Sequence, residues 1–196
     1  MDTYFYDNIE GWFNWHGLYD EIVGELPDGS NVIEIGSWMG KSIVYLADQV
    51  KKSDKNIKIT AIDIWDPSYN HPVFLPMIEL AKNSNTDLHG LFLFNLQKCG
   101  VSDLIASLKM NSLMASKNFK KESLDMAFLD ANHSYDAVIE DLTAWWPKIK
   151  PYGIFAGHDY LNPPPDGVKQ AVDEFFKSKN IFVQIKDGCW YVRKPI

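Results

Sequence analysis

The chain has 196 residues, of which 46% are hydrophobic and 14% aromatic, and its formal net charge is −7. This composition excludes an intrinsically disordered chain and fits one domain with a sizeable core. The negative charge argues against binding to a nucleic-acid backbone, which requires clustered lysine and arginine. The densest basic run, residues 51–58, lies between an expected helix and an expected strand, which favours a solvated loop.

No apolar run is long enough to span a bilayer, and the first residues, MDTYFYDNIEGW, lack the basic region of a signal peptide. We therefore expect no membrane partner and a cytoplasmic location. Cys99 and Cys189 show neither CxxC spacing nor a metal-ligand pattern, which predicts free thiols. A small molecule is the expected partner, and the sequence leaves a homo-oligomer open.

Residues 1–28 form an extension that is rich in aromatic side chains. Its second half predicts a helix that packs on the sheet, because apolar residues recur there at helical spacing: Leu18, Tyr19, Ile22 and Val23. The segment from Tyr4 to Trp15 has two interpretations. It either packs against the domain or forms a lid over the site.

Residues 32–47, VIEIGSWMGKSIVYLA, are the most informative stretch. The run from Val32 to Ile35 predicts a buried strand, and two glycines, Gly36 and Gly40, separate it from an apolar helix. A strand, a glycine turn and a helix open nucleotide-binding α/β sheets, because glycine lets the backbone approach a ligand and the helix start offers unpaired N–H groups. A plain strand-to-helix turn is the alternative interpretation.

The second expected strand, residues 59–62, ends at Asp63. An acidic residue at this place is the usual acceptor for ribose hydroxyls. A dinucleotide site requires G-x-G-x-x-G, but the positions that follow Gly36 in that pattern hold Trp38 and Lys41. The sequence therefore argues against NAD or FAD as the ligand.

The spacing is instead E-x-G-x-x-x-G, from Glu34 through Gly36 to Gly40, and with Asp63 it resembles the first motifs of class I S-adenosylmethionine-dependent methyltransferases. In that family the glycine loop lies against the methionine part of the ligand. The resemblance implies contacts to methionine from the loop, to ribose from Asp63 and to adenine from residues 111–112, with a tryptophan as a pocket wall. The implied cofactor-binding residues are Glu34, Gly36, Ser37, Trp38, Gly40, Asp63, Trp65, Asn111, Ser112 and Asp130.

Residues 66–100 are longer than a crossover between two strands needs. They contain several prolines, Pro76 among them, followed by an apolar run from Leu91 to Leu96 that predicts a helix. We expect an insertion here that borders the substrate. Further strands are expected at 104–109, 125–129 and 153–157, the last after a break at KPYG, and amphipathic helices follow the fourth and fifth strands, with Asp166 as the candidate N-cap of the second helix.

The last part of the chain predicts a hairpin, because Asp187-Gly188 suits a type I′ turn between IFVQIK and CWYVRK. An α/β sheet that ends in an antiparallel hairpin is the class I methyltransferase architecture. The resemblance implies a doubly wound seven-stranded sheet of order 3-2-1-4-5-7-6, with strand 7 antiparallel and helices on both faces. Residues 29–196 would form this domain.

Polar side chains follow the fourth and fifth strands, in LDANHSYDAVIEDL and GIFAGHDY. Ligands of a doubly wound sheet lie outside the carboxyl ends of strands near the switch point. We therefore expect Asp130, His133, His158 and Asp159 to converge above the ligand. The alternative is that the two aspartates only cap helices, but each has a histidine nearby, which favours a functional site.

These two motifs resemble the small-molecule O-methyltransferases that include macrolide-sugar and cephalosporin-pathway enzymes. In that group an acidic residue closing strand four and two adjacent residues closing strand five bind Mg²⁺, which implies Asp130, His158 and Asp159 as metal ligands here. This chain has a histidine where the strand-five pair is often two acids. Mg²⁺ prefers oxygen ligands, whereas imidazole suits Mn²⁺ or Zn²⁺ better. The expected ion is Mg²⁺, by the resemblance, or Mn²⁺.

We expect a methyltransferase that uses S-adenosylmethionine to O-methylate a small hydroxylated metabolite, such as a sugar or a natural product. The expected catalytic residues are Asp130, His133 and His158: a metal lowers the pKa of the acceptor hydroxyl, and without one a histidine accepts the proton. Two alternatives stay open. One is another nucleotide-binding enzyme such as a dehydrogenase, against which Trp38 argues, and the other is a non-catalytic binding module, against which the polar strand ends argue.

Overall fold

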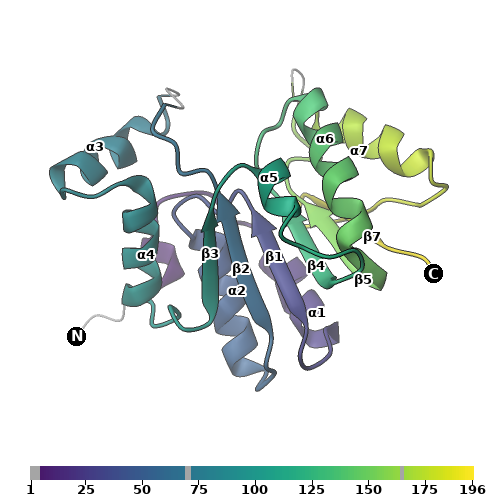
Figure 1. The fold of residues 1–196 in the computed structure, drawn as a ribbon, viewed down its shortest axis with the longest axis horizontal. Coiled ribbons are helices and arrows are strands. Elements are labelled where there is room, and N and C mark those ends of the chain that lie inside the picture. The colour runs from purple at the N-terminus through teal and green to yellow at the C-terminus, as the bar shows by residue number, and fades with distance from the viewer. Residues whose placement is uncertain (1–4, 69–71, 164–165) are drawn as a thin grey trace.

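The computed structural model describes residues 5–68, 72–163 and 166–196. These residues contain one seven-stranded sheet of order β3-β2-β1-β4-β5-β7-β6 (Figure 1). β7 is antiparallel to both of its neighbours, and the other paired strands are parallel. The predicted fold class and strand order are therefore confirmed. The strands are β1 Asn31–Ile35, β2 Lys58–Asp63, β3 Ile105–Lys109, β4 Leu124–Leu129, β5 Ile149–Gly157, β6 Gln184–Lys186 and β7 Cys189–Arg193.

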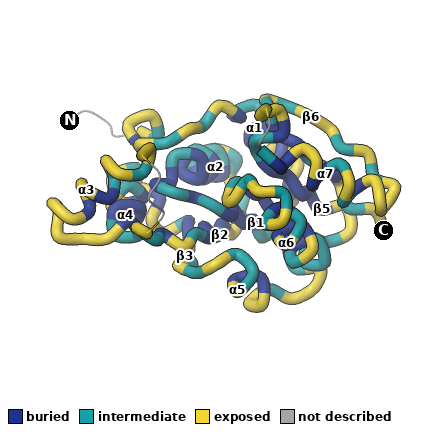
Figure 2. Tube along the Cα trace, turned by 90° about the horizontal axis from the view of Figure 1, so that it is seen from above, coloured by how far each residue is buried: buried dark blue, intermediate teal, exposed yellow. Residues whose placement is uncertain are grey.

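Helices cover both faces of the sheet (Figure 1). One apolar core joins the sheet to α1, α2 and α4, and a second core joins it to α6 and α7. Burial is accordingly greatest where the central strands and α2 meet, whereas α3 is mostly exposed (Figure 2). The helices are η1 Tyr6–Asn8, α1 His16–Glu25, α2 Lys41–Lys52, α3 Leu75–Asn83, α4 Leu88–Lys98, α5 Ser112–Ser116, α6 Tyr135–Trp145, η2 Trp146–Lys148 and α7 Val168–Lys177.

The terminal hairpin confirms the turn prediction. Asp187 has a φ of 51° and Gly188 a φ of 78°, so both central residues have the positive φ of a type I′ turn. The Asp187 carboxylate also accepts a hydrogen bond from the backbone N–H of Leu18 at 2.9 Å. The hairpin is thereby attached to the first turn of α1.

One predicted strand boundary was wrong, and one helix was missed. β5 begins at Ile149, before the expected break at KPYG, because these residues form an irregularity inside the strand: the β4–β5 register shifts there and Tyr152 has a φ of 65°. The insertion contains two helices, and α3 was missed. The sequence indicated no helix around Pro76, but proline is compatible with the first turn of a helix, where the N–H that it lacks would have no partner within the helix.

The N-terminal extension packs closely along α1 and α2. The ring of Phe13 lies 4.9 Å from that of Tyr45 and 5.0 Å from that of Trp15, which is 1% exposed. Trp12 is 63% exposed. Packing thus accounts for the side chains of Phe13 and Trp15. The lid over the site stays a prediction, and Tyr4, where the segment begins, lies outside the described residues.

Two further expectations concern the membrane and the cysteines. Among the described residues, no helix has the length and apolar character needed to cross a bilayer. Cys99 is partly buried and Cys189 is buried, and neither is in a disulfide. The prediction of free thiols is confirmed.

Candidate active site

A tight turn joins β1 to α2 at the carboxyl edge of the sheet. Gly36 has a φ of 89°, Trp38 44° and Gly40 93°, all in the left-handed region that glycine adopts without strain. The Gly36 N–H donates to the carbonyl of Ile62 at 2.7 Å, which ties the turn to β2. The predicted glycine loop therefore lies where doubly wound sheets bind ligands.

Asp63 fixes the shape of this turn. Its carboxylate accepts the backbone N–H of Trp38 at 2.9 Å and that of Trp65 at 2.8 Å. The indole N–H of Trp65 donates to the carbonyl of Trp38 at 2.6 Å, so the buried Trp65 supports the loop from beneath. The Trp38 ring is partly buried and packs against Phe74. Asp63 keeps further lone pairs for the ribose hydroxyls that the sequence assigns to it.

We expect Asp63→Ala to weaken the binding of S-adenosylhomocysteine by roughly 1–3 kcal/mol, because a ribose acceptor is lost and two loop N–H groups lose their partner. Isothermal titration calorimetry measures this difference. Asp66→Ala is the matched control: this partly exposed aspartate also accepts a backbone N–H, that of Ser68 at 2.8 Å. Equal affinities of the Asp63 variant and the wild type would contradict the assignment.

Glu34 lies beneath the glycine loop and is only 1% exposed. Tyr19 of α1 donates its hydroxyl to the Glu34 carboxylate at 2.7 Å, and Ser42 of α2 donates to it at 3.0 Å. Ser37, also buried, donates its hydroxyl to the Glu34 carbonyl at 3.3 Å. Glu34 thus joins β1, α1 and α2 below the predicted methionine site. Burial raises its pKa to about 7, although the bonds from Tyr19 and Ser42 oppose this rise.

This raised pKa predicts a pH dependence of stability. An unfolded glutamate releases its proton near pH 4.5, whereas folded Glu34 keeps it up to about pH 7. The free energy of unfolding should therefore fall as the pH rises through this interval, by on the order of 3 kcal/mol. Chemical denaturation of wild type, Glu34→Gln and the exposed control Glu10→Gln at several pH values tests this. Parallel curves for wild type and Glu34→Gln would refute it.

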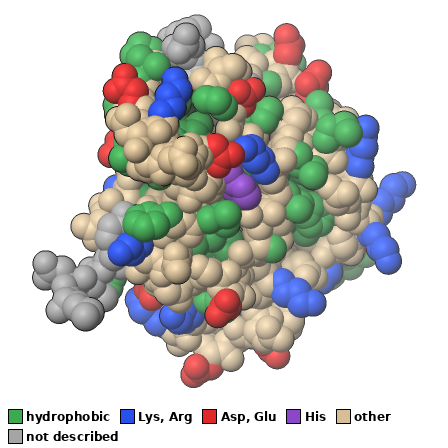
Figure 3. Space-filling view, turned by 60° about the vertical axis from the view of Figure 1, so that its left-hand side comes forward, with side chains coloured by type: hydrophobic (Ala, Val, Ile, Leu, Met, Phe, Trp, Pro, Cys, Tyr) green, Lys and Arg blue, Asp and Glu red, His purple; other side chains and the backbone are tan. Residues whose placement is uncertain are grey.

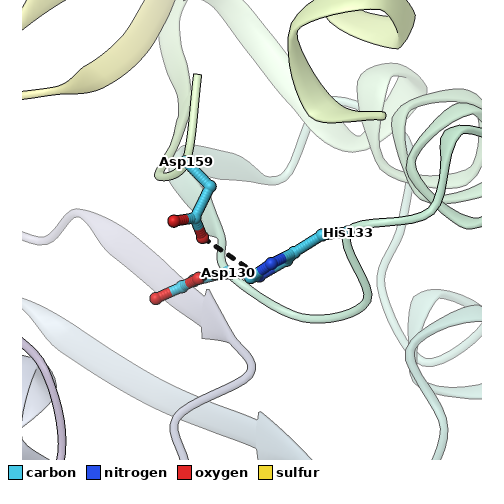
Figure 4. Close-up of side chains that lie close together, drawn as sticks. All are labelled: Asp130, His133 and Asp159. Carbon is cyan, nitrogen blue, oxygen red and sulfur yellow. Dashed lines mark ion pairs between the residues drawn. The ribbon is translucent and has the colours of Figure 1, made fainter. Parts of the chain in front are cut away.

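Two loops bring the predicted polar residues together at the ends of β4 and β5 (Figure 4). His133 Nε2 lies 3.0 Å from Asp159 Oδ2 and 3.5 Å from Asp130 Oδ1. One ligand atom from each of the three residues lies within 4.8 Å of the other two. Asp130 adjoins the glycine turn, because its N–H donates to the carbonyl of Ile35 at 2.8 Å. The convergence predicted for these residues is present.

The charges in this cluster are strongly coupled. Hydrogen bonds to Asp130 and Asp159 raise the pKa of His133 to about 10. Burial alone would raise the pKa of Asp159, but the bonds from His133 and His158 outweigh burial and hold this pKa well below its usual range. Burial raises the pKa of Asp130, against the bond from His133. These shifts favour an imidazolium at His133, paired with the carboxylate of Asp159.

His158 lies beside the cluster in a different orientation. Its Nδ1 is 3.2 Å from Asp159 Oδ1, and its ring is 4.3 Å from that of the buried Trp15. Burial would lower its pKa, but Asp159 and Asp130 raise it. The structure therefore groups His133, rather than the predicted ligand His158, with the two carboxylates. The role of His158 as a ligand stays a prediction.

Asn111 and Ser112 stand just past β3, as the sequence suggested. The Asn111 side chain caps α5 by accepting the N–H of Leu113 at 2.9 Å. The Ser112 hydroxyl donates to the buried Asp141 and accepts the indole N–H of Trp145 at 2.8 Å. Both side chains are thus used within the protein, and an approach to adenine stays a prediction for this segment.

Sequence reasoning missed three residues that border the site: Ser42, Asn162 and Asp166. Ser42 is the second residue of α2, two positions after Gly40, and it bonds to Glu34. Asn162 donates to Asp159 at 2.7 Å and to Asp166 at 3.1 Å. The only signal for Asp166 was its place before α7, where it suggested a helix cap.

The comparisons with known proteins now decide the family. Residues 33–160 match the family described as a methyltransferase domain, which is more than half of the chain. The chain belongs to this methyltransferase family. It is therefore an enzyme, and the donor of its family is S-adenosylmethionine. A search of curated proteins gave no match.

Solved methyltransferase structures share the fold at low sequence identity. The O-methyltransferase NovP has a TM-score of 0.64 at 15% identity, over 92% of this chain and 79% of NovP. A Geobacter sulfurreducens methyltransferase gives 0.63 at 12% identity, over 96% of this chain and 81% of its own. The Bacillus cereus O-methyltransferase, solved in complex with SAH, gives 0.58 at 15% identity, over 92% and 79%. At these identities the likeness establishes the fold alone.

Proposed function

We propose that this methyltransferase transfers the methyl group of S-adenosylmethionine to a hydroxyl oxygen of a small molecule. The observation that carries the proposal is the position of His133: it lies between two carboxylates, next to the glycine turn, at the carboxyl edge of the sheet. NovP and the Bacillus cereus protein, which share the fold, are described as O-methyltransferases.

The donor would lie along the glycine turn. Gly36, Ser37 and Gly40 would face its methionine part, with Glu34 supporting them from beneath, and Asp63 would accept the ribose hydroxyls. Trp38 would wall the pocket. Methyl transfer is an in-line displacement, so the main task of the enzyme is to align the acceptor oxygen with the methyl group.

His133 would accept the proton of the acceptor hydroxyl. In the unliganded protein its raised pKa favours the imidazolium at neutral pH. The donor carries a positive sulfonium, and a positive charge nearby disfavours the protonated ring, so donor binding lowers the pKa of His133. This direction favours the neutral ring, which is the form that can act as a general base. Asp130 and His158 would orient the ring and the acceptor.

The same residues fit a divalent cation. Asp130, His133 and Asp159 offer two carboxylates and one imidazole within 4.8 Å, a donor set that suits Mn²⁺ better than Mg²⁺. A bound cation would act as a Lewis acid that lowers the pKa of the acceptor hydroxyl. Such a cation would add to the neutralisation of Asp130 and Asp159 by His133 and His158.

A methyl-transfer screen tests the proposal. Wild-type protein is incubated with labelled donor and pools of hydroxylated metabolites, with and without EDTA. If a metal takes part, EDTA abolishes turnover and Mg²⁺ or Mn²⁺ restores it. Asp159→Asn should then lose turnover together with metal dependence but still bind S-adenosylhomocysteine. Full turnover in EDTA would reject the metal and leave His133 or His158 as the base.

The acceptor is proposed to be a metabolite such as a sugar or a natural product, in a cytoplasmic enzyme. Lysine and arginine side chains are interspersed with acidic and apolar ones on the face that Figure 3 shows, which agrees with the net charge of −7. This distribution does not favour a phosphate backbone. Methylation of RNA or DNA in the same screen would contradict the small-molecule acceptor.

A further inference from the structure

His133 has a carboxylate at each ring nitrogen. Its Nε2 faces Asp159 and Asp130 in the cluster of Figure 4. On the other side of the ring, Nδ1 lies 3.5 Å from Asp166 Oδ2. The Asp166 side chain is only 12% exposed. Carboxylates therefore contact the ring of His133 on two sides. The proposed reaction gives roles to Asp130 and Asp159 but none to Asp166.

Several bonds hold Asp166 in this place. The next residue, Gly167, donates its N–H to the backbone carbonyl of His133 at 2.8 Å. Asp166 Oδ1 accepts the N–H of Val168 at 3.0 Å, at the start of α7, and Oδ2 accepts from Asn162 at 3.1 Å. A Cβ on Gly167 would lie 2.2 Å from the backbone nitrogen of Tyr135, so this segment is packed tightly against the start of α6.

We propose that Asp166 is a positioning residue for the methyl-transfer reaction: it accepts the Nδ1–H of His133 and directs Nε2 toward the acceptor. The inference rests on the proposed role of His133. The hydrogen bond at one ring nitrogen decides which nitrogen is available for chemistry at the other. This holds whether Nε2 accepts a proton or binds a cation, since ligating histidines also donate their second N–H to a carboxylate.

The N-cap residue of α7 is Gly167, not the predicted Asp166. Accepting the N–H of Val168 at the start of α7 is the simpler role for Asp166, and it needs only Oδ1. Asp166→Asn separates the two roles, because the carbonyl oxygen of asparagine can still accept the N–H of Val168, whereas the amide NH₂ that replaces Oδ2 cannot accept a hydrogen bond from His133. We expect kcat to fall by about 10–100-fold with KM for the donor unchanged. In a His133→Gln background, Asp166→Asn should cause no further loss of kcat.

Asp28→Asn is the matched control. This remote aspartate also accepts a backbone N–H, that of Asn56 at 2.6 Å, and its variant should keep wild-type kcat. The same single and double variants at 133 and 166 are compared by chemical denaturation, where a direct contact makes their destabilising effects non-additive.

The possible outcomes distinguish a failure of the proposed function from a failure of the positioning role of Asp166. An inactive wild type contradicts the proposed function, and the denaturation cycle then decides the contact between Asp166 and His133 without any turnover. An active enzyme in which Asp166→Asn keeps wild-type kcat, or lowers kcat equally with and without His133, overturns the positioning role. Additive destabilisation overturns the contact itself.

Discussion

Replacing His133 by glutamine should lower the rate of methyl transfer by about 10²–10⁴-fold, the usual contribution of a positioned acid or base. Glutamine fills similar space but cannot accept a proton at the position of Nε2. The donor lies along the glycine turn in the proposed arrangement, so the affinity for S-adenosylhomocysteine should stay close to that of the wild type. Single-turnover rates at saturating donor separate this loss from slow product release.

His16→Gln is the control for this experiment. His16 lies on α1, where its Nε2 is 3.2 Å from the Tyr6 hydroxyl, away from both carboxylates. Its variant should keep the wild-type rate. If His133→Gln is fully active while His158→Gln is not, the base is His158, and the role given to the three-residue cluster is wrong.

Gly36→Ala should destabilise the protein by roughly 2–6 kcal/mol. The left-handed φ costs alanine about 1–3 kcal/mol, and the overpacked methyl group costs about 1–3 kcal/mol more. A Cβ at this position would lie 1.8 Å from the backbone oxygen of Asp130 and 2.5 Å from its carbonyl carbon. Both partners are backbone, so neither can rotate away as a side chain would. Urea denaturation measures the loss.

Gly24→Ala is the control, because an added methyl group at this position meets open space. A Cβ on Gly24 meets no heavy atom within 4 Å, and the residue lies within α1. Alanine should therefore stabilise the helix by up to about 1 kcal/mol. A Gly36→Ala variant as stable as the wild type would show that the ends of β1 and β4 separate easily. That result would contradict the close contact between the glycine turn and Asp130.

Gly36 also shows how far sequence reasoning reached. The motif correctly indicated a glycine turn, but the reason offered was close approach of a ligand. The structure adds a second reason, the contact with the backbone of Asp130, which arises only when β1 pairs with β4. Such contacts join segments distant in the chain, and local patterns do not report them.

Local signals explain what was predictable. Apolar runs located the central strands because both faces of the sheet are covered by helices. Asp187-Gly188 specified its turn by backbone preference alone. By contrast, the grouping of His133 with Asp130 and Asp159 depends on side-chain directions, which the sequence pattern does not report. The contact between Asp166 and His133 joins two loops, so the sequence indicated only a helix cap at Asp166.

Calorimetric titration with S-adenosylhomocysteine is the most direct test of the central claim, that the glycine turn and Asp63 bind the methyl donor. We predict saturable binding at one site per chain by the wild type, weaker binding by Asp63→Ala, and no binding of NADH. Absence of S-adenosylhomocysteine binding, or tight binding of NADH in its place, would contradict the account.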